Sequence, residues 1–251
     1  MDLSLRRLIR RGDRPGPDAM TLSEHLGELR RRLVICVAAY VIAATVAVFV
    51  YEPILHFLLK PLCNINAGHC QLYVTSPLDG LSLRVKISVF GGLVFSSPVL
   101  FWQIWRFVTP GLRASEKRYA IPFVIAAFFL FIFGCAVAYI SLPHALSFLS
   151  AVGGPNLKQI YDPIPYLGLI LLMMTLFGLT FEFPVLLVAL QLAHVVTPEK
   201  LLKSWRWAVI LITLAAAIFT PSSDPFSMLA LAVPLVFFYF VSIGLGKLFG
   251  R

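Results

Sequence analysis

Long runs of uncharged, mostly apolar residues constrain the fold of this chain more than any other feature. An apolar helix needs about 20 residues to cross the roughly 30 Å hydrocarbon core of a bilayer. Hydrophobic residues make up 59% of the chain and charged residues 13%, about half of the roughly 25% usual in soluble domains. We therefore predict an all-α, polytopic integral membrane protein with six transmembrane helices, at residues 33–51, 87–105, 119–143, 164–193 (interrupted by Glu182), 207–219 and 225–246.

The fifth run is unusually short. Residues 207–219 would form a helix about 20 Å long, roughly two thirds of the hydrocarbon thickness. Either the helix extends into flanking polar residues such as Ser222 and Ser223, or the bilayer is locally thinner around it. The sequence leaves both explanations open.

The distribution of basic residues predicts the orientation. Lysine and arginine are retained in cytoplasmic loops, and all but four of the 21 basic residues fall on one side: the exceptions are Lys60, Arg84, Lys86 and Lys158. Both termini are therefore expected in the cytoplasm. The net charge of +9 follows from this topology, so we expect no nucleic-acid partner. Residues 1–20 are predicted to be a disordered basic tail, and residues 21–251 the membrane domain.

The external loops then lie at about residues 52–84, 144–163 and 220–224. Cys63 and Cys70 both fall in the first of these loops, on the oxidising side, and we favour a disulfide between them. A metal site that includes His69 is the weaker alternative, because a fourth ligand is missing. Cys36 and Cys135 lie within spans and are interpreted as small apolar residues.

An amphipathic helix is predicted just before the first span. Thr21 and Glu24 have the spacing of a capping box, and one apolar stripe follows at helical spacing: Leu22, Leu26, Leu29 and Leu33. We expect this helix to lie along the cytoplasmic membrane surface before the chain enters the bilayer.

Glu28 lies on the polar side of that helix and has two interpretations. It can pair with Arg32 four residues later, a contact worth about 0.2–0.5 kcal/mol. Because that pair is weak, Glu28 could instead accept a guanidinium group from a partner through a stronger bidentate bond.

Four motifs carry a resemblance to a known family. Residues 24–33 (EHLGELRRRL) resemble the N-terminal signature of the TatC family, the multi-spanning receptor subunits of the twin-arginine protein translocase. Three further matches follow in the same order as in that family: FVTPGL at 107–112 with EKR at 116–118, FG at 177–178 with FEFP at 181–184, and TP at 220–221 with Asp224.

This resemblance implies a role in the bacterial cytoplasmic membrane. TatC-like proteins bind signal peptides that bear paired arginines and export folded proteins using the proton-motive force. They work in membrane lipid with the single-span partners TatA and, in many organisms, TatB, as copies within a larger complex. By matching positions, Glu28 and Glu116 would form the carboxylate patch for the arginines, and the surrounding surface would be shaped by His25, Leu29, Arg30, Phe107 and Pro110.

Two of the matched residues, Glu116 and Asp224, also have a local interpretation. Glu116 lies among basic neighbours and resembles an ordinary loop charge, but the family match raises its functional interpretation. Asp224 follows a turn one residue longer than the family's, and with Pro225 it fits a helix N-cap, which we favour. Pro61 matches a proline of the family's first external loop.

Glu182 is the only acidic residue within an apolar run. Intramembrane carboxyl groups usually face a cavity or a partner, so we predict a polar contact with a partner helix or with a proton, and the sequence does not separate the two. An alternative function is a secondary transporter of a small solute with Glu182 as the proton or ion site, although no two matching halves are evident. Neither a P-loop nor a hydrolase motif occurs, so we expect no enzyme activity, cofactor or metal.

Overall fold

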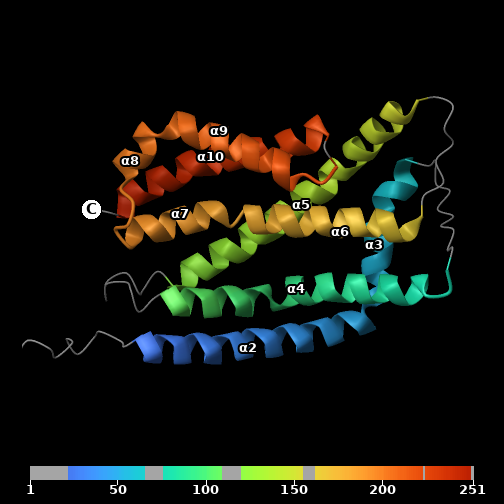
Figure 1. Cartoon of the computed structure of the whole chain (residues 1–251), viewed down its shortest axis with the longest axis horizontal. Coiled ribbons are helices and arrows are strands. Elements are labelled where there is room, and N and C mark those ends of the chain that lie inside the picture. The colour runs from blue at the N-terminus through green and yellow to red at the C-terminus, as the bar shows by residue number, and fades with distance from the viewer. Residues whose placement is uncertain (1–21, 66–75, 109–119, 155–161, 223, 250–251) are drawn as a thin grey trace, which may run out of the picture.

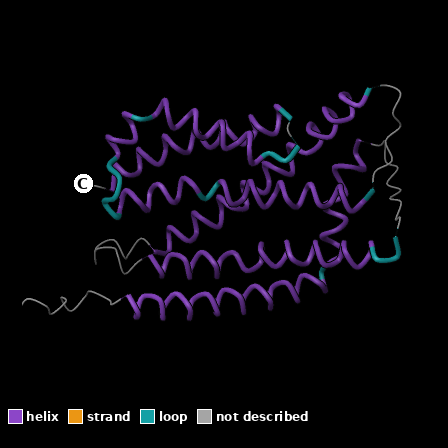
Figure 2. The backbone as a smooth tube through the Cα atoms, in the orientation of Figure 1, coloured by secondary structure: helices purple, strands orange, loops and turns teal. Residues whose placement is uncertain are grey.

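The computed structural model shows a bundle of long helices (Figures 1 and 2). It describes residues 22–65, 76–108, 120–154, 162–222 and 224–249, among which there is no strand. In chain order the helices are α2 (Leu22–Phe49), α3 (Tyr51–Ile65), α4 (Asp79–Val108), α5 (Ala120–Gly153), α6 (Pro163–Thr180), α7 (Phe183–Leu192), α8 (Pro198–Lys203), α9 (Trp205–Phe219) and α10 (Pro225–Phe249).

The predicted spans are confirmed. Five segments of the described chain are long and apolar enough to cross a membrane: Leu26–Phe49, Asp79–Phe107, Ile121–Gly153, Pro163–Leu192 and Pro225–Leu248. The sixth is the shorter apolar helix Trp205–Phe219. The ends expected in the cytoplasm lie together at the left of Figure 1, including the start of α2 and the end of α10.

The short fifth span is not an error in its predicted boundaries. Helix α9 has 15 residues, which corresponds to about 22 Å. It ends at Phe219, and Ser222 beyond it is buried and donates a hydrogen bond to Asp224 instead of extending the helix. A locally thinner bilayer around α9 therefore stays the prediction.

The first helix differs from expectation. The amphipathic segment is helical as predicted, but it continues into the first span without a break as the single helix α2. The expectation of a separate helix along the membrane surface is therefore wrong. No proline or glycine turn separates the segment from the span, and its stripe residues Leu26 and Leu33 are 63% and 60% exposed along the flank of α2.

Small residues let α2 approach α4 closely. A Cβ atom on Gly92 would lie 2.7 Å from the Cβ of Ala44, and one on Gly91 would lie 2.8 Å from the Cβ of Ala47. A similar approach joins α5 to α6, where a Cβ on Gly178 would lie 2.7 Å from the ring of Phe131. Such contacts replace the hydrophobic effect as the force that joins helices in lipid.

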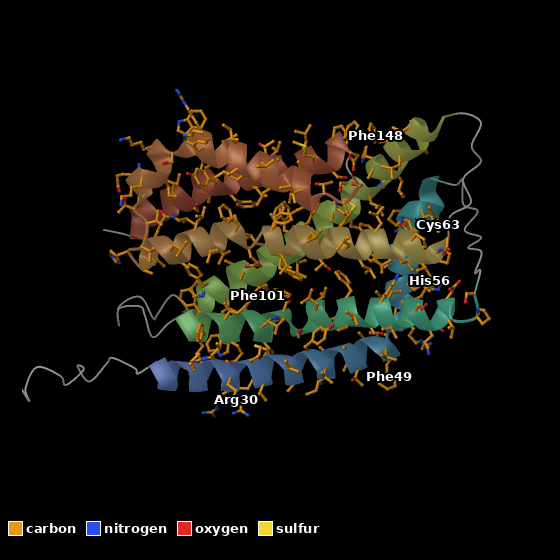
Figure 3. All side chains as sticks on the ribbon, in the orientation of Figure 1. Arg30, Phe49, His56, Cys63, Phe101 and Phe148 are labelled. Atoms are coloured by element: carbon orange, nitrogen blue, oxygen red, sulfur yellow. The ribbon has the colours of Figure 1, made fainter. Side chains whose placement is uncertain are left out.

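The core lies between α4, α5, α6 and α10. Its largest fully buried side chains are the three rings of Phe131, Phe177 and Phe181. Figure 3 shows these helices surrounded by side chains on all flanks, as expected for a protein in lipid. In the last turn of α7, Gln191 donates from Nε2 to the Ser242 carbonyl at 3.1 Å and joins α7 to α10.

The external end is more helical than predicted. The loop expected at residues 52–84 contains helix α3, and α4 already begins at Asp79. Likewise, α5 continues to Gly153, well into the loop expected from residue 144. These loops were predicted too long because a segment outside the hydrocarbon can still form a helix when one of its faces packs on the bundle. In α3 that face carries Leu58 and Leu62, which are part of the core. Helix α3 crosses the ends of the long helices (Figure 1).

Candidate functional site

The first candidate residues lie on the cytoplasmic turns of α2. Leu29 is 44% exposed, and Figure 3 shows Arg30 pointing away from the bundle. Glu28 lies one turn before Arg32, which donates to its Oε1 from Nε at 3.1 Å and also from Nη2. The internal ion pair that the sequence suggested is therefore present.

Of the other members of the predicted patch, the structure describes only the side chain of Phe107. Phe107 is half-buried in the last turn of α4. Pro110 and Glu116 lie outside the described residues, and so does the side chain of His25. The proximity of Glu28 to Glu116 therefore stays a prediction.

The second candidate site begins at a break between α6 and α7. Helix α6 ends at Thr180 and α7 begins at Phe183, with Pro184 in its first turn. Proline cannot donate a backbone hydrogen bond, so Pro184 leaves the Thr180 carbonyl without its helical donor and favours the break at this point. Glu182 lies on the intervening turn at the N-cap of α7, but its side chain makes no capping bond.

One carboxyl oxygen of Glu182 is buried without a hydrogen-bond partner in the described chain. Its Oε1 atom is inaccessible to solvent and has no hydrogen-bond partner among the described residues. The residue lies about 15 Å along the helix axis from Leu192, the cytoplasmic end of the segment. An unsatisfied buried oxygen at that depth costs free energy, so the site favours a partner that brings a hydrogen-bond donor.

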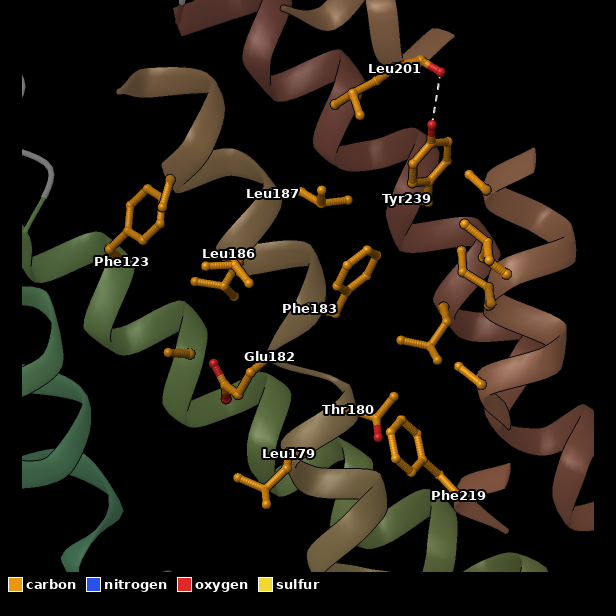
Figure 4. A pocket seen from close by; sticks show the side chains of 18 of the residues that line it. Phe123, Leu179, Thr180, Glu182, Phe183, Leu186, Leu187, Leu201, Phe219 and Tyr239 are labelled. Atoms are coloured by element: carbon orange, nitrogen blue, oxygen red, sulfur yellow. Dashed lines mark hydrogen bonds between the residues drawn. The ribbon is translucent and has the colours of Figure 1, made fainter. Parts of the chain in front are cut away.

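A cavity of about 940 Å³ adjoins Glu182 (Figure 4). Leu179, Leu186 and Leu211 line it and yet are 52%, 54% and 60% exposed on the flank of the protein. The cavity is therefore a groove open to the side, which we call the lateral groove. Its wall comes from α4 to α10 and includes Phe101, Trp105, Phe123, Thr180, Glu182, Phe183, Ser204, Trp207, Phe219, Leu235 and Tyr239.

Tyr239 fixes the cytoplasmic end of the lateral groove. Its hydroxyl donates to the Leu201 carbonyl at 2.8 Å, which holds α8 against α10. Sequence reasoning found Glu182 but missed Tyr239 and the groove. The short fifth span was the available signal, because α9 packs mainly on α10 and makes few contacts with the rest of the bundle, beside which the groove lies.

The external residues have structural surroundings. Asp224 is 1% exposed and accepts a hydrogen bond from the Ser227 backbone amide at 2.7 Å, as an N-cap of α10 does. Pro61 is buried inside α3. Cys63 is disulfide-bonded, while its predicted partner Cys70 lies outside the described residues.

Comparisons with known proteins agree with these features. The sequence model of the family described as "Sec-independent protein translocase protein (TatC)" matches residues 24–234. The TatC protein of Frankia casuarinae is 40% identical over 245 residues, covering 92% of this chain and 67% of the relative. That of Aquifex aeolicus is 36% identical over 235 residues, covering 92% and 97%.

Solved structures show the same architecture. A crystal structure of the twin arginine translocase receptor TatC superposes with a TM-score of 0.73 at 35% identity, covering 91% of this chain and all of that one. A second crystal structure, of TatC in the detergent DDM, gives a TM-score of 0.75 at 34% identity. The six-span count agrees with that fold. This chain belongs to the TatC family and is a multi-pass membrane subunit of a Sec-independent protein translocase.

Proposed function

We propose that this chain is the receptor subunit of a twin-arginine translocase. It binds signal peptides with paired arginines on its cytoplasmic face through Glu28 and Glu116. With single-span partners of the TatA type, of the TatB type where the organism has one, and with further copies of itself, it exports folded proteins using the proton-motive force. The observation that carries this proposal is the Glu28 carboxylate on the cytoplasmic turns of α2, in a fold shared with a solved receptor, where the guanidinium of Arg32 is already its ligand.

The Arg32 pair supports this role because it shows a guanidinium bound to this carboxylate, through one oxygen, in a pair that is easily exchanged. A pair of this spacing is worth about 0.2–0.5 kcal/mol, whereas a bidentate guanidinium–carboxylate bond is stronger. The Glu28 side chain is 23% exposed and its Oε2 atom is buried, so an incoming arginine reaches the carboxylate only as Arg32 moves aside.

Photo-crosslinking to a signal peptide tests the receptor site. Peptides with paired arginines or paired lysines are compared on wild type, Glu28→Gln and Glu116→Gln, with Glu199→Gln as the control because Glu199 is an exposed cytoplasmic carboxylate on α8. We expect at least tenfold less crosslinking for the first two variants and none of this loss for the third. Unchanged crosslinking in Glu28→Gln and Glu116→Gln would reject the site. An equal loss in all three variants would show that only the total negative charge of the cytoplasmic face matters.

The lateral groove suits a single transmembrane helix of a partner. Its lining is apolar apart from a few groups, so a lipid-embedded helix loses nothing by entering it. A polar side chain halfway along that helix would satisfy Oε1 of Glu182, which the described chain leaves without a donor. Of the two interpretations of Glu182, we therefore favour the partner helix, and no observation favours the small-solute transporter.

Disulfide crosslinking tests this docking. A cysteine at Leu211 in the groove is paired with cysteines along a TatA-type or TatB-type helix, and Val41→Cys on α2 is the control because Val41 is 54% exposed but remote from the groove. We expect crosslinks from residue 211 that Glu182→Leu reduces severalfold. Equal crosslinking from residues 41 and 211 would exclude the groove as the docking site.

A further inference from the structure

Helix α3 contains a proline that leaves one backbone carbonyl without its helical donor. In an α-helix the carbonyl of each residue accepts a hydrogen bond from the amide four residues later. Four residues after Phe57 is Pro61, which lies inside α3 and has no N–H group. The Phe57 carbonyl must therefore find its donor outside the helix or remain unsatisfied.

Tyr139 of α5 supplies that donor. Its hydroxyl donates to the Phe57 carbonyl at 2.8 Å, across 82 positions of sequence. The same two residues also stack, with ring centroids 4.4 Å apart and planes 8° from parallel. The hydrogen bond and the stacking together fix both the distance and the direction of α3 relative to α5.

A second tyrosine makes a similar bond without the proline. Tyr166 of α6 is 4% exposed, and its hydroxyl donates to the Leu58 carbonyl at 2.9 Å. Four residues after Leu58 is Leu62, which carries an N–H group of its own. No proline removes the amide opposite Leu58, although that amide also hydrogen-bonds the Tyr166 hydroxyl, so Tyr166 provides a comparison in which no donor has been lost to proline.

We propose that Tyr139 is a positioning residue that replaces the hydrogen bond removed by Pro61 and so sets the angle at which α3 crosses the external end of the bundle. A helix interrupted by proline can bend at that point in more than one way. The bond from Tyr139 selects one bend, and Leu58 and Leu62 then pack into the core beside it. Pro61 therefore makes the bend of α3 depend on a hydrogen bond from α5.

This assignment is independent of the proposed receptor function because it is tested first by geometry. Spin labels are attached through ketone side chains introduced at His56 on α3 and Val152 on α5, both of which are exposed. This chemistry leaves the Cys63 disulfide intact. Distance distributions between the labels are measured for the full chain in lipid nanodiscs, in wild type, Tyr139→Phe, Pro61→Ala and the double variant.

We expect Tyr139→Phe to broaden the distance distribution at least twofold in the wild-type background. In the Pro61→Ala background the restored amide satisfies Phe57, so Tyr139→Phe should cause no further broadening. Tyr166→Phe, the control, should have the same effect in both backgrounds. Equal broadening by Tyr139→Phe with and without Pro61, or no broadening at all, would overturn the proposal.

Export of a reporter with a paired-arginine signal is measured for the same variants, normalised to the amount of subunit in the membrane. We expect Tyr139→Phe to lower export at least twofold with Pro61 present and not to lower it further with Pro61→Ala. An equal fall in both backgrounds would contradict the positioning role. A wild-type protein that exported nothing would instead count against the proposed function, while the distance measurement would still decide the role of Tyr139.

Discussion

Arg32 donates to Glu28 through two nitrogens, Nε at 3.1 Å and Nη2, and both bonds end on the same carboxylate oxygen, Oε1. The two residues are one helical turn apart on α2. A guanidinium group that binds Glu28 from outside must therefore share this carboxylate with Arg32 or displace it. The ion pair makes the proposed receptor site a competition between an internal arginine and an external one.

Removing the internal competitor should strengthen signal-peptide binding. We expect Arg32→Gln to lower the Kd of a paired-arginine peptide by about 1.4- to 2.3-fold, which corresponds to the 0.2–0.5 kcal/mol of such a pair. Fluorescence anisotropy of a labelled peptide measures it. Arg31→Gln removes the same charge from an exposed neighbour, so an equal gain in both variants would show that only net charge matters.

Replacing Glu182 should stabilise the isolated subunit while it weakens partner docking. Glu182→Leu removes a buried oxygen that has no hydrogen-bond partner in the described chain, a burden of about 1–3 kcal/mol. The expected rise in Tm is about 2–4 °C per kcal/mol, measured by thermal unfolding in detergent. Thr180→Val is the control, since the Thr180 hydroxyl already donates to the Leu176 carbonyl at 2.6 Å. A fall in Tm for Glu182→Leu would show that the carboxyl group is satisfied within the subunit.

A larger side chain at the α2–α4 contact should separate these helices. A Cβ on Gly92 would lie 2.8 Å from the backbone Cα of Ala44, which cannot rotate away. We expect Gly92→Leu to lower the free energy of unfolding by about 1–3 kcal/mol, measured by denaturant titration in detergent micelles. Gly244→Leu should change it far less, because no atom lies within 4 Å of a Cβ at that position. Equal losses would mean that glycine at residue 92 is not required for packing.

The cysteines can be distinguished by alkylation. The chain has four cysteines, of which Cys36 and Cys135 are free and Cys63 is disulfide-bonded. In denaturant we expect two thiols to react before reduction and four after it, counted by mass spectrometry. In the Cys63→Ser variant we expect three thiols to react before reduction instead of two, and peptide mapping is expected to locate the additional one at Cys70. A released thiol at any other position would overturn the predicted pairing.

The sequence predicted much of the candidate site as well as the spans. Glu182 was recognisable because a carboxyl group within an apolar run is costly and seldom without a role. Its surroundings were not recognisable, since Phe101, Leu211 and Tyr239 of the lateral groove are ordinary apolar or aromatic residues of different spans. The i, i+4 spacing predicted the pair of Glu28 with Arg32, but no spacing indicated that α2 would continue through this segment without a break.

By itself, the sequence determined the six spans and their orientation, because both depend on local quantities: the length of an uncharged run and the side on which lysine and arginine are retained. Only the tertiary structure decided how α3 lies against the bundle and where the lateral groove opens. The bond from Tyr139 to the Phe57 carbonyl joins residues 82 positions apart. Its geometry depends on how α5 and α3 pack, which neither residue encodes alone.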